Sequence, residues 1–561
     1  MQNHTRLRLH GFIAIIVALS LAELTAATAG PIRLVARTGQ VLRVPGPTTN
    51  LSPVDARLDS IENYSMNNLG QAAFAARTSR GTAVWSEASG DLAVAVDRAP
   101  APGLPPNSVY SLQAFSISTF PPSAPLLRLD DQGRTLYGGL VDWPSPANLR
   151  GAAGYWAHHG NQVSLIAAEG TPAPLSYAGM YFQDIGSLDS FPRPGHGSVV
   201  KSGTGGEFFA VPAQLGFIGS PPTSQGLRSY WMMGPAGPRL VQTLTQQWFS
   251  QGPLDLVVNR RGDAAYETSS SPIVMTLVRE QAGMPATVLD RSTPFPGGLP
   301  GAYFNGVSDL QLNDAGTLGF VGLAGGPRHP TRDEGLFVVD AAGAIRTIVL
   351  EGDAAPDVPI TPQGFHGATF SSRTSIPFRL RSLGPNDEFV FQATLTGPAV
   401  PFPSQETLWI DRAGALTRLL SGGDAMPGLA ENLRLVGGFA NPFTQVLMND
   451  QGLIVVQAGF SVGGSGNPQG NGIWALQPGA DDFTPIAITG QSLAMPDGTS
   501  GPLTSLTLGE VNNLGQISMK IRYGQYDALI ISSAAAIPEP SSLLLIVSFA
   551  AAFAGLRRPI A

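Results

Sequence analysis

The chain has 561 residues, a net charge of −7 and a pI near 5.5, which argues against a nucleic-acid partner because phosphate binding requires clustered Lys and Arg. It contains no cysteine, so disulfides, thiolate zinc sites and cysteine nucleophiles are excluded. Hydrophobic residues make up 43% and charged residues 13%, while Gly and Pro together make up about a fifth, a composition that predicts an all-β chain with many turns.

Residues 1–29 have the layout of a secretory signal peptide. Arg6 and Arg8 form a basic start, an apolar stretch covers residues 11–22, and Ala27 and Ala29 supply the small residues of a cleavage site. The apolar stretch is shorter than the ~20 residues that a membrane-spanning helix needs. We therefore expect cleavage after Ala29 and the secretion machinery as a partner.

A short motif recurs along the body of the chain at a spacing of roughly 60 residues, which is typical of repeat architectures. It has Asn at its first position, Gly at its fourth and a bulky apolar residue four places later, as in residues 313–320. The glycine position is filled by Gly70, Gly133, Gly195, Gly262, Gly316, Asp387, Gly452 and Gly515. Asn can bond its own backbone and Gly accepts a positive φ, so each copy predicts the corner of a β-hairpin.

A second motif lies between these corners and predicts a buried strand. It is a short apolar run centred on one bulky residue, namely Trp85, Trp156, Trp231, Phe337, Trp409 or Trp474 in the clear copies. A further strand follows it and ends in Gly-Asp or Gly-Gln before a proline, as in residues 422–427. One repeat therefore contains four antiparallel strands, which is typical of a β-propeller blade.

We predict that residues 30–533 form one β-propeller of eight four-stranded blades, or seven if a degenerate repeat is not a separate blade. The last repeat has three strands and stops near Ser533. Residues 32–37 are expected to supply its fourth strand beside residues 529–532, because this pairing removes two open sheet edges. The alternative fold is two smaller β domains in tandem. Helices are expected only in the two terminal segments.

The C-terminal segment, residues 534–561, combines three features. Pro538, Glu539 and Pro540 precede an apolar run at residues 543–556, and Arg557 and Arg558 follow it. The proline-rich entry interrupts a helix and the arginines provide a positive end on the cytoplasmic side. A plain C-terminal anchor helix is the alternative, although 14 residues or so is short for a span of ~20.

This arrangement resembles the PEP-CTERM sorting signal, and with the Asn-x-x-Gly repeats it resembles tandem-repeat, interchangeable-anchor envelope proteins of unknown biochemical role. The resemblance implies export, recognition by an exosortase-type membrane protease, transient anchoring in the inner membrane and a final place in the cell envelope or outside the cell of a Gram-negative bacterium. It also implies an association with exopolysaccharide or biofilm matrix.

The chemistry-bearing residues form no catalytic or metal-binding motif. The histidines lack paired ligand spacing, and His158 and His159 are expected at a hairpin tip, where adjacent side chains diverge. The Asn-Asp-x-Gly corners lack the further acidic ligands of a calcium loop. No nucleophile elbow and no phosphate-binding glycine loop is present. We therefore expect no cofactor, no metal and no catalytic residue.

Two tryptophans lie outside the repeat register and indicate a candidate ligand surface. Trp143 and Trp248 are expected in loops that open on the same face of a propeller, and Arg328, His329 and His366 are in loops of the same types. Aromatic and polar groups on such a face could stack sugar rings or hold a protein partner. Local packing of long loops is the alternative, since loop aromatics often cover apolar surface.

The sequence therefore predicts an exported, envelope-associated structural or binding protein whose partner is exopolysaccharide or another surface protein. The alternative is a secreted polysaccharide lyase or hydrolase with a site on the loop face. Two carboxylates about 5–9.5 Å apart near the axis would favour glycoside hydrolysis, but the sequence identifies no such pair.

Overall fold

The protein is described here from a computed structural model. The described residues are 32–44, 54–96, 100–110, 127–142, 150–160, 162–174, 179–185, 208–217, 227–234, 236–244, 256–271, 274–327, 333–356, 367–371, 378–397, 400, 405–437, 441–464 and 467–534. Over these ranges every regular element is a β-strand, and the strands form eight antiparallel sheets. Each sheet corresponds to one repeat of the sequence, and we number the sheets 1 to 8 in chain order.

The first four sheets have the following strands. Sheet 1 contains β2 (Val41–Val44), β3 (Val54–Met66), β4 (Ala72–Thr78), β5 (Gly81–Ser86) and β6 (Ala93–Val96). Sheet 2 contains β7 (Val109–Tyr110), β8 (Leu127–Leu129), β9 (Thr135–Asp142), β10 (Arg150–His159) and β11 (Gln162–Ala168). Sheet 3 contains β12 (Met180–Ile185), β13 (Phe209–Phe217), β14 (Leu227–Gly234) and β15 (Gly237–Leu244). Sheet 4 contains β16 (Leu256–Val258), β17 (Ala264–Ser271), β18 (Val274–Gln281) and β19 (Met284–Asp290).

The other four sheets follow the same order. Sheet 5 contains β20 (Tyr303–Leu312), β21 (Leu318–Gly325), β22 (Glu334–Val339) and β23 (Ile345–Leu350). Sheet 6 contains β24 (Thr369–Phe370), β25 (Phe378–Leu383), β26 (Phe389–Thr396), β27 (Gln405–Arg412) and β28 (Ala415–Ser421). Sheet 7 contains β29 (Leu433–Leu435), β30 (Phe443–Met448), β31 (Ile454–Val462), β32 (Gly470–Leu476) and β33 (Thr484–Ile488). Sheet 8 contains β34 (Ser492–Ala494), β35 (Ser500–Val511), β36 (Gln516–Tyr523), β37 (Tyr526–Ser533) and β1 (Arg33–Arg37).

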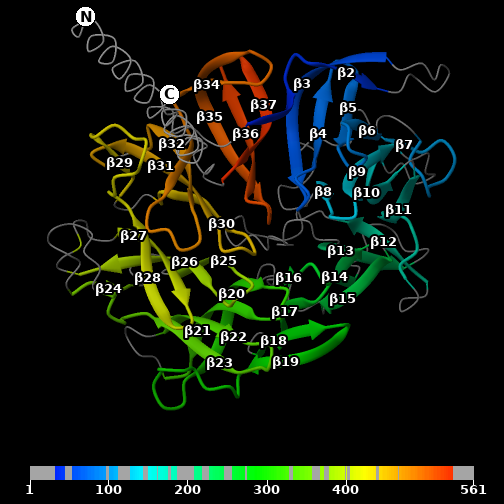
Figure 1. Cartoon of the computed structure of the whole chain (residues 1–561). Helices are drawn as coiled ribbons and strands as arrows, with labels where there is room; N and C mark the ends of the chain where they lie inside the picture. Colours follow the sequence, from blue (N-terminus) through cyan, green and yellow to red (C-terminus); the bar gives the residue numbers. More distant parts are fainter. Residues whose placement is uncertain are drawn as a thin grey trace, which may run out of the picture.

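The sheets are arranged side by side around a central axis, and their order around the axis follows the chain (Figure 1). Early strands of consecutive repeats contact one another, including β3 with β8, β16 with β20, β20 with β25, β25 with β30 and β30 with β35, and β35 contacts β3 to complete the ring. The hydrophobic cores lie between neighbouring sheets, because each buried cluster draws residues from adjacent repeats. This is the β-propeller that the repeat predicts, and it is a single ring, so the alternative of two tandem β domains is wrong.

The ring closes through the first described strand, as the sequence predicts. Strand β1 pairs antiparallel with β37, and Arg33 lies opposite Ile531 while Arg37 lies opposite Ala528. Ala36 is fully buried in a core that also contains Leu529 of sheet 8 and Trp85 of sheet 1. The two ends of the repeat array are therefore joined in one sheet, which leaves neither end as an open edge at the seam.

The corner motif forms its turn through the asparagine side chain. In sheet 1 the Asn67 Oδ1 accepts hydrogen bonds from the backbone N–H groups of Leu69 at 3.1 Å and Gln71 at 2.9 Å. Gly70 follows with a φ of +79°, a conformation that glycine adopts without steric cost. The same position in sheet 6 is Asp387, which keeps a φ of +58°, so the backbone shape of the corner persists even where the glycine is absent.

The tryptophans of the repeat register are core residues, as predicted. Their exposed fractions are 1% or less for Trp85, Trp156, Trp231, Trp409 and Trp474. Two indole N–H groups donate to the proline-containing loop that precedes their own sheet, namely Trp156 to Pro102 O at 3.1 Å and Trp474 to Pro427 O at 2.9 Å. In sheets 2 and 7 the preceding loop therefore accepts the polar end of the buried ring, whereas Trp231 and Trp409 donate to Ser229 Oγ and Thr407 Oγ1 of their own strands.

Candidate functional site

The residues proposed from the sequence as a ligand surface lie outside the described residues. This holds for Trp143, Trp248, Arg328, His329 and His366. The sorting and processing residues Ala27, Ala29, Pro538, Glu539, Pro540, Arg557 and Arg558 also lie outside them.

The corner asparagines connect neighbouring sheets as well as shaping their own turns. Asn449 Nδ2 donates to the backbone carbonyl of Asn512, the corner residue of the next sheet, at 2.7 Å. Asn512 Nδ2 donates in turn to the carbonyl of Asn67 at 3.2 Å, across the seam between sheets 8 and 1. The same bond joins Asn67 to Asp130, Asn259 to Asn313, and Asn313 to Gly384. The corner residues thus form a hydrogen-bonded ladder around the axis.

In sheets 1, 2, 4, 5, 7 and 8 the residue that follows the corner residue forms a second set of contacts, which we call the axial network. Its members are Asn68, Asp131, Arg260, Asp314, Asp450 and Asn513. Asn68 Nδ2 donates to Asp131 Oδ2 at 2.8 Å, and Asn513 Nδ2 donates to Asp450 Oδ2 at 2.7 Å. Each of these bonds joins two neighbouring sheets at the corner end of the ring.

Arg260 is the one long cation of the axial network, and it reaches two carboxylates. Its Nε donates to Asp314 Oδ2 at 2.5 Å in the next sheet, and its Nη2 donates to Asp450 Oδ2 in sheet 7. Sheets 4 and 7 are not neighbours, so this second bond spans the axis. Burial disfavours the charged guanidinium, but Asp314 and Asp450 together outweigh it and raise the pKa of Arg260.

The axial network satisfies its carboxylates with groups of the same chain. Asp314 also accepts the backbone N–H of Arg260 at 3.0 Å, and Asp131 accepts the backbone N–H of Asn68 at 2.7 Å. Charge-assisted bonds of this kind are stronger than bonds between neutral groups. The geometry therefore suits a structural latch that holds sheets of the ring together.

A second ion pair, between Arg128 and Glu510, joins the early strands β8 and β35 near the axis. Glu510 of β35 accepts a bond from Arg128 Nη1 of β8 at 2.7 Å, and Ser65 Oγ of β3 donates to its Oε2 at 3.2 Å. Three consecutive sheets of the ring, sheets 8, 1 and 2, meet at this carboxylate. Burial raises the pKa of Glu510, although Arg128 acts against that shift.

Sheet 5 holds two carboxylates side by side at the strand ends opposite to its corner. Glu334 begins β22, and Glu351 follows β23 and donates its backbone N–H to the Glu334 carbonyl at 2.9 Å. Burial, together with the charge of Glu351, raises the pKa of Glu334 to about 8. Glu334 is therefore a carboxylic acid that keeps its proton at neutral pH.

The equivalent carboxylate in sheet 6 has different neighbours. Glu406 accepts hydrogen bonds from Gln392 Nε2 at 2.6 Å and from Thr394 Oγ1 at 3.0 Å, both on the adjacent strand β26. In sheet 5 the matching strand β21 carries Val321 and Leu323 at these two places. Two donors that favour an ionised carboxylate are thus replaced by apolar side chains beside Glu334.

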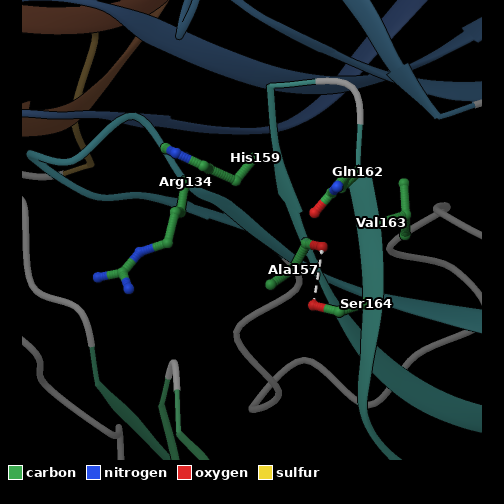
Figure 2. Close-up of a pocket in the computed structure, with 6 residues that line it drawn as sticks. All are labelled: Arg134, Ala157, His159, Gln162, Val163 and Ser164. Atoms are coloured by element: carbon green, nitrogen blue, oxygen red, sulfur yellow. Dashed lines mark hydrogen bonds between the residues drawn. The ribbon is translucent and has the colours of Figure 1, made fainter.

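A pocket of about 350 Å³ lies at the corner end of sheet 2 (Figure 2). It is lined by Arg134, Ala157, His159, Gln162, Val163 and Ser164. His158 and His159 are at the end of β10 and form the predicted hairpin tip with β11. Burial, with His159 beside it, lowers the pKa of His158.

The part of the chain that the structure describes contains no group of three or more His, Asp or Glu residues arranged to hold a metal ion. Within the same residues we find no helix with the length and apolar character to cross a membrane.

The sequence reasoning missed the axial network because it treated the corners only as turns. A signal was present, since the residue after each corner Asn or Asp is Asn68, Asp131, Arg260, Asp314, Asp450 or Asn513. One arginine among three aspartates at equivalent places of a closed ring indicates pairing across that ring. The pocket had a weaker signal, which was Asp130 in place of the corner asparagine.

Comparisons with known proteins give one family and several distant likenesses. A family described as "Family of unknown function (DUF7453)" matches residues 66–544, and no curated protein matches the chain. Among solved structures, the polysaccharide lyase Uly1 is 10% identical, with a TM-score of 0.34 over 78% of this chain and 95% of that one. The Dos1 propeller is 9% identical, with a TM-score of 0.28 over 72% and 91%.

The β-propeller domain of the Trilobed protease from Pyrococcus furiosus is 7% identical, with a TM-score of 0.30 over 77% of this chain and 98% of that one. Likenesses at this level do not bear on function. The assignment of the propeller rests on the sheet order, the closing pair of strands and the contacts around the axis.

Proposed function

Because the chain belongs to the DUF7453 family, whose function is unknown, we propose a function from its own residues: an exported, envelope-associated β-propeller that binds matrix polysaccharide or a surface protein. Export and sorting by an exosortase-type protease are supported by the two terminal segments of the sequence. The observation that carries the binding role is the axial network, whose carboxylates are held by Arg260, Asn68 and Asn513.

The latch favours binding at the periphery of the ring over chemistry at the axis. A ligand that entered at the axis on the corner side would have to displace charge-assisted bonds between sheets, which are stronger than bonds between neutral groups. The same bonds keep neighbouring sheets in a fixed relation. A rigid ring of this kind presents its loops and hairpin tips as a stable binding surface.

The test is retention of the full chain on the producer's own exopolysaccharide at low salt. We expect the chain to be retained and to be released by the same polysaccharide added in solution. A matched column without polysaccharide controls for adhesion to the support. Failure to be retained at low salt would contradict polysaccharide binding and leave a surface protein as the partner to seek.

Glu334 favours a second candidate, a polysaccharide lyase or hydrolase with its site on the loop face. A carboxylic acid with a pKa of about 8 beside a second carboxylate has the protonation state that a general acid requires. This candidate predicts that acidic and neutral exopolysaccharides are shortened by the chain and that Glu334→Gln abolishes the cleavage. Polysaccharide that keeps its length after prolonged incubation would exclude it.

A further inference from the structure

The pocket of sheet 2 lies between the corner and the hairpin tip of that sheet. In three other sheets the residue at the place of Arg134 bonds to the hairpin tip. Gln71 Nε2 donates to Glu87 O at 3.1 Å in sheet 1, and Glu388 Oε1 accepts from Arg412 Nε at 3.0 Å in sheet 6. In sheet 4, Asp263 Oδ1 accepts the backbone N–H of Ala282 at 3.0 Å.

In sheet 2 the equivalent residue, Arg134, turns back to its own corner. Its Nε donates to Asp130 Oδ2 at 2.6 Å, and Asp130 Oδ1 accepts the backbone N–H groups of Arg134 at 2.7 Å and Gln132 at 2.9 Å. The Asp130 side chain is fully buried. Asp130 therefore holds Arg134 at the edge of the pocket.

The strand register places the hydrogen-bond donors in one row. His159 of β10 lies opposite Gln162 of β11, and Ala157 lies opposite Ser164, so all four side chains share one face of the hairpin. Thr135 lies opposite His158, which puts Arg134, one residue earlier, level with His159. Figure 2 shows Arg134 beside the hairpin from which His159 and Gln162 project.

We propose that this pocket binds an acidic sugar residue of a polysaccharide, with the sugar carboxylate near Arg134 and the hydroxyl groups on His159, Gln162 and Ser164. The lining contains a guanidinium, an imidazole, an amide and a hydroxyl, and it contains no carboxylate. The volume of about 350 Å³ is at the lower end of the range for small-ligand sites. This inference rests on the proposed polysaccharide-binding role and specifies where an acidic chain would be held.

Local chemistry is needed for such binding, because the whole chain carries a net charge of −7 and does not attract a polyanion by its overall field. Asp130 also compensates part of the charge of Arg134. Binding of one sugar residue is therefore weak. Several adjacent acidic sugars of one polysaccharide would increase the apparent affinity, because each of them can occupy the pocket in turn.

The experiment measures binding of a trigalacturonate to the full chain by titration calorimetry, with neutral maltotriose as a probe of equal length. We expect trigalacturonate to bind and maltotriose not to bind. The double variant His159→Ala/Gln162→Ala should weaken binding about tenfold or more, as expected for the loss of two bonds to a charged ligand. Both side chains are exposed at the tip, so this variant is expected to fold.

Arg134→Ala should abolish binding, but it also leaves a buried carboxylate without its cation, so its thermal unfolding is measured in parallel. Arg412→Ala is the matched control. Arg412 is a cation at the hairpin tip of sheet 6, outside the pocket. This variant is expected to bind trigalacturonate like the unmodified chain. Three results would each overturn the assignment. They are equal binding of maltotriose, unchanged binding in the double variant, and displacement of trigalacturonate by an equal concentration of sulfate.

The two proposals fail separately. If the unmodified chain and the double variant are retained equally on the producer's exopolysaccharide, the pocket is not the binding site but the proposed function stands. If the unmodified chain binds trigalacturonate and is not retained on exopolysaccharide, the site stands and the proposed function fails.

Discussion

At the scale of single residues, the corner asparagine has two roles that no other side chain combines. Its Oδ1 accepts backbone N–H groups of its own turn, and its Nδ2 donates to the corner carbonyl of the next sheet. Aspartate performs the first role, as Asp130 does, but has no hydrogen to donate for the second. The five corner asparagines Asn67, Asn259, Asn313, Asn449 and Asn512 are each 7% exposed or less.

Asn449→Ala is expected to lower the free energy of unfolding by about 1–3 kcal/mol, because it leaves the carbonyl of Asn512 and the N–H groups of Gln451 and Leu453 without their buried partner. Urea unfolding followed by tryptophan fluorescence measures the change. Gln451→Ala is the control, since this side chain is exposed at the same corner. An equal effect of both substitutions would show that the corner asparagine contributes only as an ordinary turn residue.

Glu334 predicts a loss of stability as the pH rises from about 4.5 to about 8. Its pKa is about 8 in the folded chain against an ordinary 4.5, so its stabilising contribution is complete below pH 4.5 and is lost as the pH rises through 8. Glu334→Gln keeps the uncharged form and should remove this slope, with a gain on the order of 2 kcal/mol above pH 8 after allowance for partial exposure.

The measurement is the midpoint of thermal unfolding from pH 4 to pH 9 for both chains. Glu406→Gln is the matched control, because Glu406 has the same place in sheet 6 but is bonded to Gln392 and Thr394, and it is not expected to flatten the decline that Glu334 causes between its two pKa values. Parallel curves for Glu334→Gln and the unmodified chain would contradict the prediction.

At the scale of elements, the hairpins and their order were predictable, and the contacts between them were not. Local signals such as the positive φ at Gly316 and the burial of Trp409 follow from residue type and repeat position. The bond from Arg260 to Asp450 joins residues 190 positions apart and depends on the way the ring closes.

The latch across the axis predicts energetic coupling between sheets 4 and 7. Arg260→Ala and Asp450→Asn are each expected to destabilise the chain modestly, and together by less than the sum, with a coupling energy of about 1 kcal/mol. A double-mutant cycle from urea unfolding measures this coupling. The pair Arg522 and Asp527, which lies within sheet 8 with an arginine side chain 60% exposed, gives the reference for a surface ion pair, where coupling is small. Additive effects at Arg260 and Asp450 would refute the latch.

At the scale of the whole molecule, stability depends on closing a ring of sheets without disulfides. Each core lies between two neighbouring sheets, including the core between sheets 8 and 1, where Ala36, Trp85 and Leu529 meet. Strand β1 contributes both to this core and to the edge of β37. Opening the seam therefore exposes apolar surface on two sheets at once, in contrast to the fraying of an ordinary terminus.

Ala36→Asp tests this consequence of closure. The substitution places a charge where the side chain is fully buried among apolar residues, and it should lower the free energy of unfolding by about 3 kcal/mol or more because a charge buried in apolar surroundings is costly. Hydrogen exchange should accelerate in β37 of sheet 8 and in β3 and β4 of sheet 1. Val41→Asp, at a residue 58% exposed on the neighbouring strand β2, is the matched control for an added carboxylate. Faster exchange confined to residues 32–37 would mean that β1 only covers an edge, because a seam that closes the ring must loosen both sheets that it joins.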